Sequence, residues 1–209
     1  MRVRITFTKQ GPLRYIGNLD LHRLWERAMR RAELPISYSQ GFNPQPKISL
    51  AAALPLGFSS RAEMLDVRLN EDLETDDIYN RLKVSLPPDI QVTQVESVDE
   101  RLPALQTQTL SAAYSVQLTE PVDGSDLKRR VEELMNAESI PRERRGKTYD
   151  LRPLVELMSV ITQADGSVWL EMTVAARESA TGRPEEVLLV LGIEPETARV
   201  ERIRLVLKE

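Results

Sequence analysis

Hydrophobic and polar positions follow two periods along the chain, and these periods predict its elements. Residues 2–8 alternate polar and apolar side chains, the two-residue period of a half-buried strand. From Leu21 to Ala32 the apolar positions recur at helical spacing, which predicts an amphipathic helix from an N-cap at Asn18 to about Glu33. The next expected elements are a strand from Lys47, strands over 63–69 and 90–98, and a helix over 76–85.

The same order of elements begins again after residues 99–111, which we interpret as a linker or a crossing segment. Strands are expected over 113–118, 147–151, 155–163, 167–175 and 199–207, and helices over 125–136 and 183–191. Strands and helices that alternate in this way are typical of the split βαβ arrangement. We therefore predict an α+β fold of two tandem ferredoxin-like (βαββαβ) domains, residues 1–100 and 111–209, the second with an extra strand.

Composition removes several classes of chemistry. The 209 residues include no Cys and one His, which excludes disulfides, thiolate zinc sites and a Cys nucleophile in this chain. No segment of about 18 apolar residues occurs, and the first residues lack the apolar core of a signal peptide. We expect a cytoplasmic protein without a membrane span, a metal or a cofactor.

Charge is unevenly distributed, although the formal net charge is only -4. Residues 1–50 carry nine Lys and Arg against three Asp and Glu, a net charge of +6. Residues 51–100 carry four against eleven, a net charge of -7. Nucleic-acid-binding surfaces are local patches, so the acidic total does not exclude one in the basic first quarter.

The predicted first helix carries a basic stripe opposite its apolar face. Arg23, Arg27 and Arg30 lie at i, i+4 and i+7, and Arg31 follows them. A solvated helix face, with cations near the C-terminus of the helix, explains Arg30 and Arg31 well and Arg23 poorly. A phosphate-binding stripe is the alternative, and the sequence does not decide between the two.

No Asp or Glu occurs between Glu33 and Glu63, and this acid-free window combines amides, aromatic rings and cations. Its candidate RNA-binding residues are Tyr38, Gln40, Phe42, Asn43, Lys47 and Arg61. Bases stack on rings, amides read base edges, and cations contact phosphates. In the alternative interpretation, Tyr38 and Phe42 of a proline-rich loop fill the edge of the core.

Catalytic and metal-binding patterns are sparse. His22 has no second His or Cys to act with, and the acidic residues of 71–77 fit the N-terminus of a helix better than a cation site. A second basic run, Arg142–Lys147, could extend a basic surface, although a solvated loop with Asp150 and Arg152 as local charges is the simpler interpretation. Nothing in these patterns identifies an enzyme.

Several motifs together resemble a known family. In the first half these motifs are KQGPLRYIGNLDLHR from Lys9, YSQGFNP from Tyr38 and LPLG from Leu54. In the second half they are GK from Gly146 and DLRP from Asp150. The chain resembles the radical-SAM-associated domain of unknown function, which implies a radical SAM protein as partner. The family's usual Ser-His is Gly17-Asn18 here and its loop His is Gln45, so the resemblance carries no histidine-dependent acid/base or metal role over to this chain. The element order is also similar to that of the tandem ferredoxin-like CRISPR repeat-RNA endonucleases, a likeness of topology alone.

Three functional hypotheses follow. The first is a non-catalytic RNA-binding accessory protein for a structured RNA such as tRNA or rRNA, which presents the RNA to a radical SAM enzyme. The second is a protein-interaction subunit that docks on a radical SAM partner without contacting RNA. The third is a metal-independent endoribonuclease that uses His22.

Overall fold

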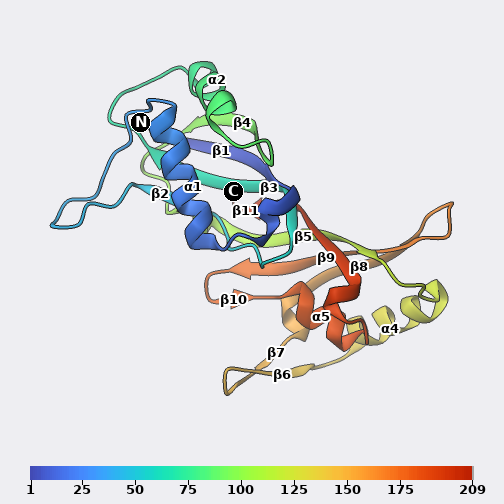
Figure 1. The fold of residues 1–209 in the computed structure, drawn as a ribbon. Helices are drawn as coiled ribbons and strands as arrows, with labels where there is room; N and C mark the ends of the chain where they lie inside the picture. Colours follow the sequence, from blue (N-terminus) through green and yellow to red (C-terminus); the bar gives the residue numbers. More distant parts are fainter. Residues whose placement is uncertain (209) are drawn as a thin grey trace. The chain divides into compact units, whose positions relative to one another are not determined.

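The computed structural model describes residues 1–208, and the chain divides into two compact units. Unit 1 is Met1–Thr109, and unit 2 begins at Leu110. Each unit combines helices with a β-sheet (Figure 1), which confirms the prediction of a mixed α+β protein.

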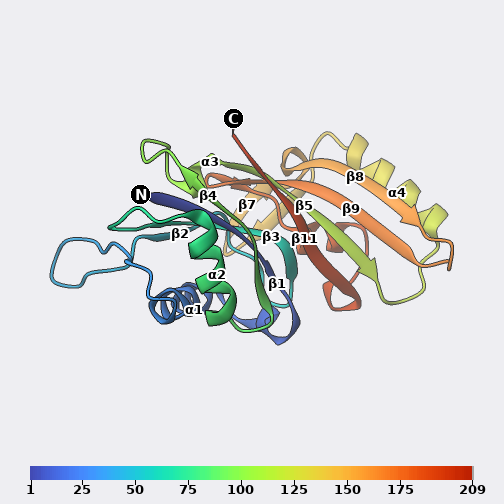
Figure 2. The same cartoon turned by 90° about the horizontal axis from the view of Figure 1, so that it is seen from above.

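Unit 1 follows the predicted order of strand, helix, strand, strand, helix, strand. Its elements are β1 (Arg2–Lys9), a 3-10 turn (Gly11–Tyr15), α1 (Asn18–Arg31), β2 (Ile48–Leu50), β3 (Ser59–Arg68), α2 (Thr75–Ser85), β4 (Ile90–Val98) and the short α3 (Leu105–Gln108). The strands lie in the order β4-β1-β3-β2, and every neighbouring pair is antiparallel. Figure 2 shows α1 and α2 on the same face of these strands.

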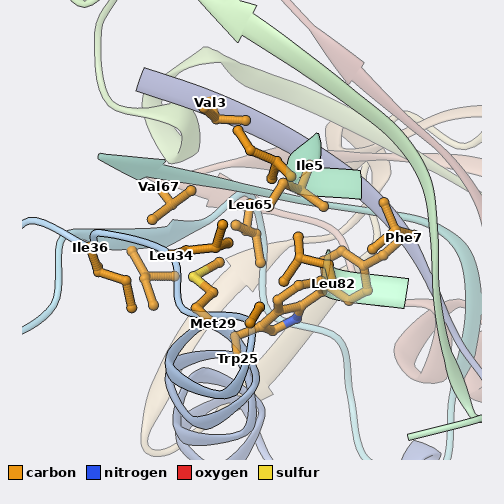
Figure 3. Close-up of a cluster of buried hydrophobic side chains, with 14 of the residues drawn as sticks. Val3, Ile5, Phe7, Trp25, Met29, Leu34, Ile36, Leu65, Val67 and Leu82 are labelled. Carbon is orange, nitrogen blue, oxygen red and sulfur yellow. The ribbon is translucent and has the colours of Figure 1, made fainter. Parts of the chain in front are cut away.

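The core of unit 1 lies between this face and the two helices. Alternation along β1 points Val3, Ile5 and Phe7 to the same side, and all three are fully buried. Trp25 of α1 meets the Phe7 ring edge-on, with ring centroids 4.7 Å apart (Figure 3). The helical period of α1 therefore fixes its outer residues as the solvent face.

The opposite face of β1 carries charge. Arg2 and Arg4 both bind the buried Asp66 of β3, with the shortest nitrogen–oxygen distances at 2.6 Å and 2.9 Å respectively. Arg2 also donates to the carbonyl oxygens of Leu102 and Pro103. Residues 99–108 are therefore a segment that crosses this face, whereas residues 109–111, expected to belong to it, already form the next strand.

Unit 2 contains more strands than unit 1. Its elements are β5 (Thr109–Leu118), α4 (Gly124–Asn136), β6 (Pro141–Arg144), β7 (Lys147–Asp150), a 3-10 turn (Arg152–Leu154), β8 (Val155–Thr162), β9 (Val168–Arg177), β10 (Ala180–Thr181), α5 (Pro184–Val190), a 3-10 turn (Pro195–Thr197) and β11 (Ala198–Leu207). In its sheet β5 lies between β11 and β9, and both β8 and β10 pair with β9. β6 and β7 form a separate hairpin.

Several predicted boundaries differ from the structure. The N-cap of α1 is Gly17 and makes no side-chain cap; Asn18 is already helical. The helix ends at Arg31, two residues early, and Glu33 takes a left-handed backbone conformation with φ at +52°. The strand expected from Lys47 is only three residues long. The finer assignment of two tandem ferredoxin-like domains, and their boundaries at 100 and 111, are not confirmed and stay predictions.

Candidate nucleic-acid interface

The outer face of α1 displays the predicted basic stripe. Leu21, Trp25, Ala28 and Met29 are buried, so the intervening arginines are turned to solvent. The Arg23 and Arg30 side chains are 68% and 61% exposed. Arg27 and Arg31 are exposed as well.

Intramolecular contacts divide these arginines into two kinds. Arg30 forms an ion pair with Glu26 at 2.7 Å, and Arg31 donates to the Ser85 carbonyl oxygen at 2.8 Å. Arg23 lies 3.5 Å from Asp20, and Arg27 has no ion pair or hydrogen bond within residues 1–208. Arg23 and Arg27 are therefore the side chains of the stripe that are most available to a ligand, because an exposed ion pair is weak.

The acid-free loop, residues 36–47, has a closed stalk and an open tip. Its stalk is closed by backbone hydrogen bonds from Lys47 to Ser37 and from Ser39 to Gln45, at 2.9 Å and 2.8 Å. The Ser39 hydroxyl also accepts from the Gln45 N–H at 2.9 Å. Figure 1 shows the loop as a pale blue ribbon that projects away from the elements of unit 1, between α1 and β2.

Tyr38 ties this stalk to α1. Its hydroxyl accepts two hydrogen bonds from the Arg30 guanidinium, both at 3.1 Å, and its partly buried ring packs against the core of unit 1. The same hydrogen bond raises the pKa of Arg30 above its ordinary value. Arg30 and Tyr38 thus position the loop, and the interpretation of Tyr38 as a ring at the core edge is the one that fits.

Phe42 occupies the loop tip and is fully exposed, with a relative exposure of 112%. It does not fill the core edge, contrary to the alternative interpretation. Gln40 and Asn43 are exposed beside it, and Lys47 is exposed at the foot of the stalk. An exposed ring can stack on a base, and the exposed amides on either side of it can hydrogen-bond to the edge of that base.

Arg61 lies apart from the loop. Ile48, next to Lys47, pairs with Val67 near one end of β3, whereas Arg61 is near the other end. Six residues of extended strand separate Arg61 from Val67, about 20 Å at the rise of a β-strand. The structure therefore brings together the α1 stripe and the loop but not Arg61.

His22 does not assemble a catalytic group. Its Nε2 lies 3.3 Å from the Ile48 carbonyl oxygen, and the ring is half-buried between α1 and β2. Over residues 1–208, no group of three or more His, Asp or Glu side chains is arranged to hold a metal ion. In the acidic run, Asp77 lies in the first turn of α2 and forms an ion pair with Arg81 at 2.7 Å.

A groove of about 580 Å³ borders the stripe and was not foreseen from the sequence. Its apolar lining is Leu13, Ile16, Leu24, Leu86 and Pro87, and Arg23, Arg27 and Arg31 also line it. The apolar residues come from three separate segments of unit 1. No local sequence pattern predicts this groove, because the groove forms only when α1, the 3-10 turn before α1 and the end of α2 pack together.

Comparisons with known proteins give a family and distant structural likenesses. The crystal structure of a Cbf5-Nop10-Gar1 complex matches with a TM-score of 0.49 and 12% identity, covering 97% of this chain and 48% of that one. An archaeal box H/ACA sRNP Nop10-Cbf5 complex matches with a TM-score of 0.45 and 12% identity, covering 96% and 46%. This chain thus spans about half the length of the chains it matches, and likenesses this distant carry no argument about function.

A family model matches the chain, whereas the curated proteins do not. None of the helices within residues 1–208 is both long and apolar enough to cross a membrane. The family model described as "Uncharacterized protein conserved in bacteria (DUF2344)" matches residues 2–184. The chain belongs to this bacterial family.

Proposed function

We propose that the protein binds RNA through α1 and the loop 36–47 of unit 1. The observation that carries this proposal is the fully exposed Phe42 ring, held at the tip of a loop without acidic residues beside the basic stripe of α1. Stacking of one base on an aromatic ring contributes about 1–3 kcal/mol to nucleic-acid binding.

Each residue has a distinct role in this proposal. Arg23, Arg27 and Lys47 contact phosphates, because they are exposed and the first two bind their own chain weakly or not at all. Phe42 stacks on an unpaired base, and Gln40 and Asn43 hydrogen-bond to base edges. Arg30 and Tyr38 act indirectly, since their mutual hydrogen bonds hold the loop on α1.

The proposal is tested by fluorescence anisotropy with labelled tRNA and short rRNA fragments at two salt concentrations. We expect the Arg23→Glu/Arg27→Glu variant to lose at least tenfold in affinity, with a larger loss at low salt. The matched control is Lys83→Glu/Arg101→Glu, which makes the same charge change at exposed positions of unit 1 away from the loop. Equal losses in both variants, or no binding by the wild type at low salt, would refute the proposed surface.

The groove beside the stripe favours a second candidate function, docking on a partner protein. Leu13, Leu24 and Leu86 give it an apolar floor that phosphate binding does not use. The family resemblance suggests a radical SAM protein as that partner. A complex that survives nuclease and high salt and is lost in Leu24→Asp would support docking; RNA binding without any such complex would exclude it.

A further inference from the structure

A second cationic cavity lies in unit 2, at the β6–β7 hairpin. It is open to solvent and has a volume of about 560 Å³. Four cationic side chains line it, namely Arg144, Arg145, Lys147 and Arg183, together with the acids Asp150 and Glu178. Figure 1 shows the hairpin as a separate two-stranded ribbon beside α5.

Hairpin geometry places two of these cations, Arg144 and Lys147, on one face of the hairpin. Arg142 pairs with Tyr149, and Arg144 pairs with Lys147, so all four side chains share one face of the two strands. Arg142 binds Glu186 of α5 at 2.7 Å, which turns that face towards the start of the helix, where Arg183 is the N-cap. The hairpin thus directs Arg144, Lys147 and Tyr149 towards Arg183.

This arrangement is unfavourable for the protein by itself. Arg144 and Lys147 lie directly opposite each other, and like charges in that position destabilise a hairpin. Arg145 in the turn has φ at +50°, a strained backbone region for a residue other than glycine. Within residues 1–208, the four cations that line the cavity have no ion pair. An anion in the cavity would relieve this repulsion.

The two acids of the cavity compensate for only part of the charge of its four cations. The Asp150 carboxylate already accepts hydrogen bonds from the N–H groups of Ile140 and Arg152, at 2.8 Å and 3.0 Å. These contacts fix its orientation at the base of the hairpin. Glu178 forms no ion pair with the cavity arginines among the described residues.

Tyr149 supplies a donor without an acceptor. Its hydroxyl is buried and has no hydrogen-bond partner among residues 1–208. Burial raises the pKa of Tyr149, so the phenol keeps its proton. A buried polar group without a partner is uncommon in folded proteins and needs a reason, which a bound acceptor would provide.

We propose that this cavity binds a phosphate group, supplied either by an RNA backbone or by a free nucleotide. The Tyr149 hydroxyl, which is closed to solvent without ligand, donates to a phosphate oxygen after a small shift of the side chains around it, and Arg144, Lys147 and Arg183 neutralise the phosphate charge. Phosphate fits better than a carboxylate, because it carries more charge and presents several acceptor oxygens to donors that converge from different elements. The site lies wholly in unit 2 and does not depend on the RNA surface proposed for unit 1.

The decisive variant is Tyr149→Phe, which removes the hydroxyl and leaves the ring. We expect affinity for the phosphate ligand to fall about tenfold, the loss of one hydrogen bond to a charged acceptor. Thermal stability without ligand should stay the same or rise, because an unsatisfied buried hydroxyl has been removed. A purely structural role for Tyr149 predicts the opposite, a lower melting temperature and unchanged affinity.

Two probes distinguish the sources of the phosphate. Adenosine 5′-monophosphate is titrated by calorimetry, with adenosine as the control, and a labelled 12-nucleotide uridine RNA is followed by anisotropy. All titrations use the full chain carrying Arg23→Glu/Arg27→Glu, so that a failure of the unit 1 surface cannot imitate a failure here. Binding of the mononucleotide assigns a free nucleotide, and binding of the RNA alone assigns a backbone phosphate.

Charge variants complete the test. The variant Arg144→Glu/Lys147→Glu should abolish the binding that Tyr149→Phe only weakens. The control variant Lys128→Glu/Arg199→Glu changes exposed positions elsewhere in unit 2 and should leave binding unchanged. Either probe bound with this pattern supports the site. No binding of either probe, or equal effects of the two charge variants, overturns it.

Discussion

At the scale of single residues, Asp66 is a strongly constrained charge of unit 1. It is buried and accepts hydrogen bonds from both Arg2 and Arg4, which are buried as well. Removing its carboxylate would leave two buried guanidinium groups without their counter-charge. We expect Asp66→Ala to lower the free energy of unfolding by about 3–5 kcal/mol in urea denaturation.

The matched control for Asp66 is an exposed pair in the same unit. Glu100 lies 3.3 Å from both Arg68 and the N-terminal nitrogen of Met1, with 55% of its side chain exposed. Glu100→Ala should therefore cost less than about 1 kcal/mol. Similar losses for the two variants would contradict the special role of Asp66.

Phe42 is the opposite case, a side chain that packing does not constrain. Its ring is fully exposed at the loop tip, so Phe42→Ala should leave the urea midpoint unchanged. RNA affinity should fall by about 1–3 kcal/mol if one base stacks on the ring. Anisotropy on both proteins, with Phe42→Trp as the variant that restores stacking, checks this expectation; equal affinities for all three proteins would rule it out.

The sequence predicted which residues of α1 face solvent, but not which of them are free to bind. The helical period places Arg23, Arg27 and Arg30 on one stripe, and the structure agrees. The use of Arg30 to hold Tyr38, and of Arg31 to cap the Ser85 carbonyl, depends on contacts across 8 and 54 residues of sequence. Such partners come from tertiary packing and leave no trace in a local pattern.

At the scale of elements, the predicted boundaries of strands and helices were accurate where the local hydrophobic pattern is regular. The strand over 90–98 was predicted residue for residue, because its alternation is regular and Pro87-Pro88 precede it. β6 was missed, since Pro141–Arg144 has no apolar alternation, although Arg145-Gly146 is a two-residue turn with positive φ at both positions. Hairpin pairing, rather than hydrophobic pattern, makes this segment a strand.

The base of that hairpin gives a prediction about pH. Hydrogen bonds from the Ile140 and Arg152 N–H groups hold the pKa of Asp150 below its ordinary value. A lowered folded-state pKa means that the stabilisation is complete above the unfolded-state pKa and is lost as pH falls through the folded-state value. The melting temperature of the wild type should exceed that of Asp150→Asn at pH 6, and the difference should vanish in acid below the folded-state pKa. A difference that stays constant from pH 6 into acid would show that the charge of Asp150 is not responsible.

At the scale of the whole molecule, the total charge hides where the charge acts. Two cationic surfaces, one in each unit, exist in a chain with a formal net charge of -4. The first was visible as an acid-free window beside a helical stripe. The second was visible only as a basic run, because the contribution of Arg183 from α5 requires the fold of unit 2.

Salt dependence separates charged from uncharged contributions in the intact protein. Each phosphate contact to single-stranded RNA adds about 0.7 to the slope of log affinity against log salt concentration, through the release of counterions. Arg23→Gln/Arg27→Gln should therefore reduce the slope by about 1.4. Phe42→Ala should weaken binding at every salt concentration and leave the slope unchanged, because stacking releases no counterion.

If one RNA occupies both sites, adding Arg144→Gln/Lys147→Gln should lower the slope by a further comparable amount. An unchanged slope in that combined variant would mean that RNA engages unit 1 alone, and a slope unaffected by Arg23→Gln/Arg27→Gln would remove the stripe from the interface.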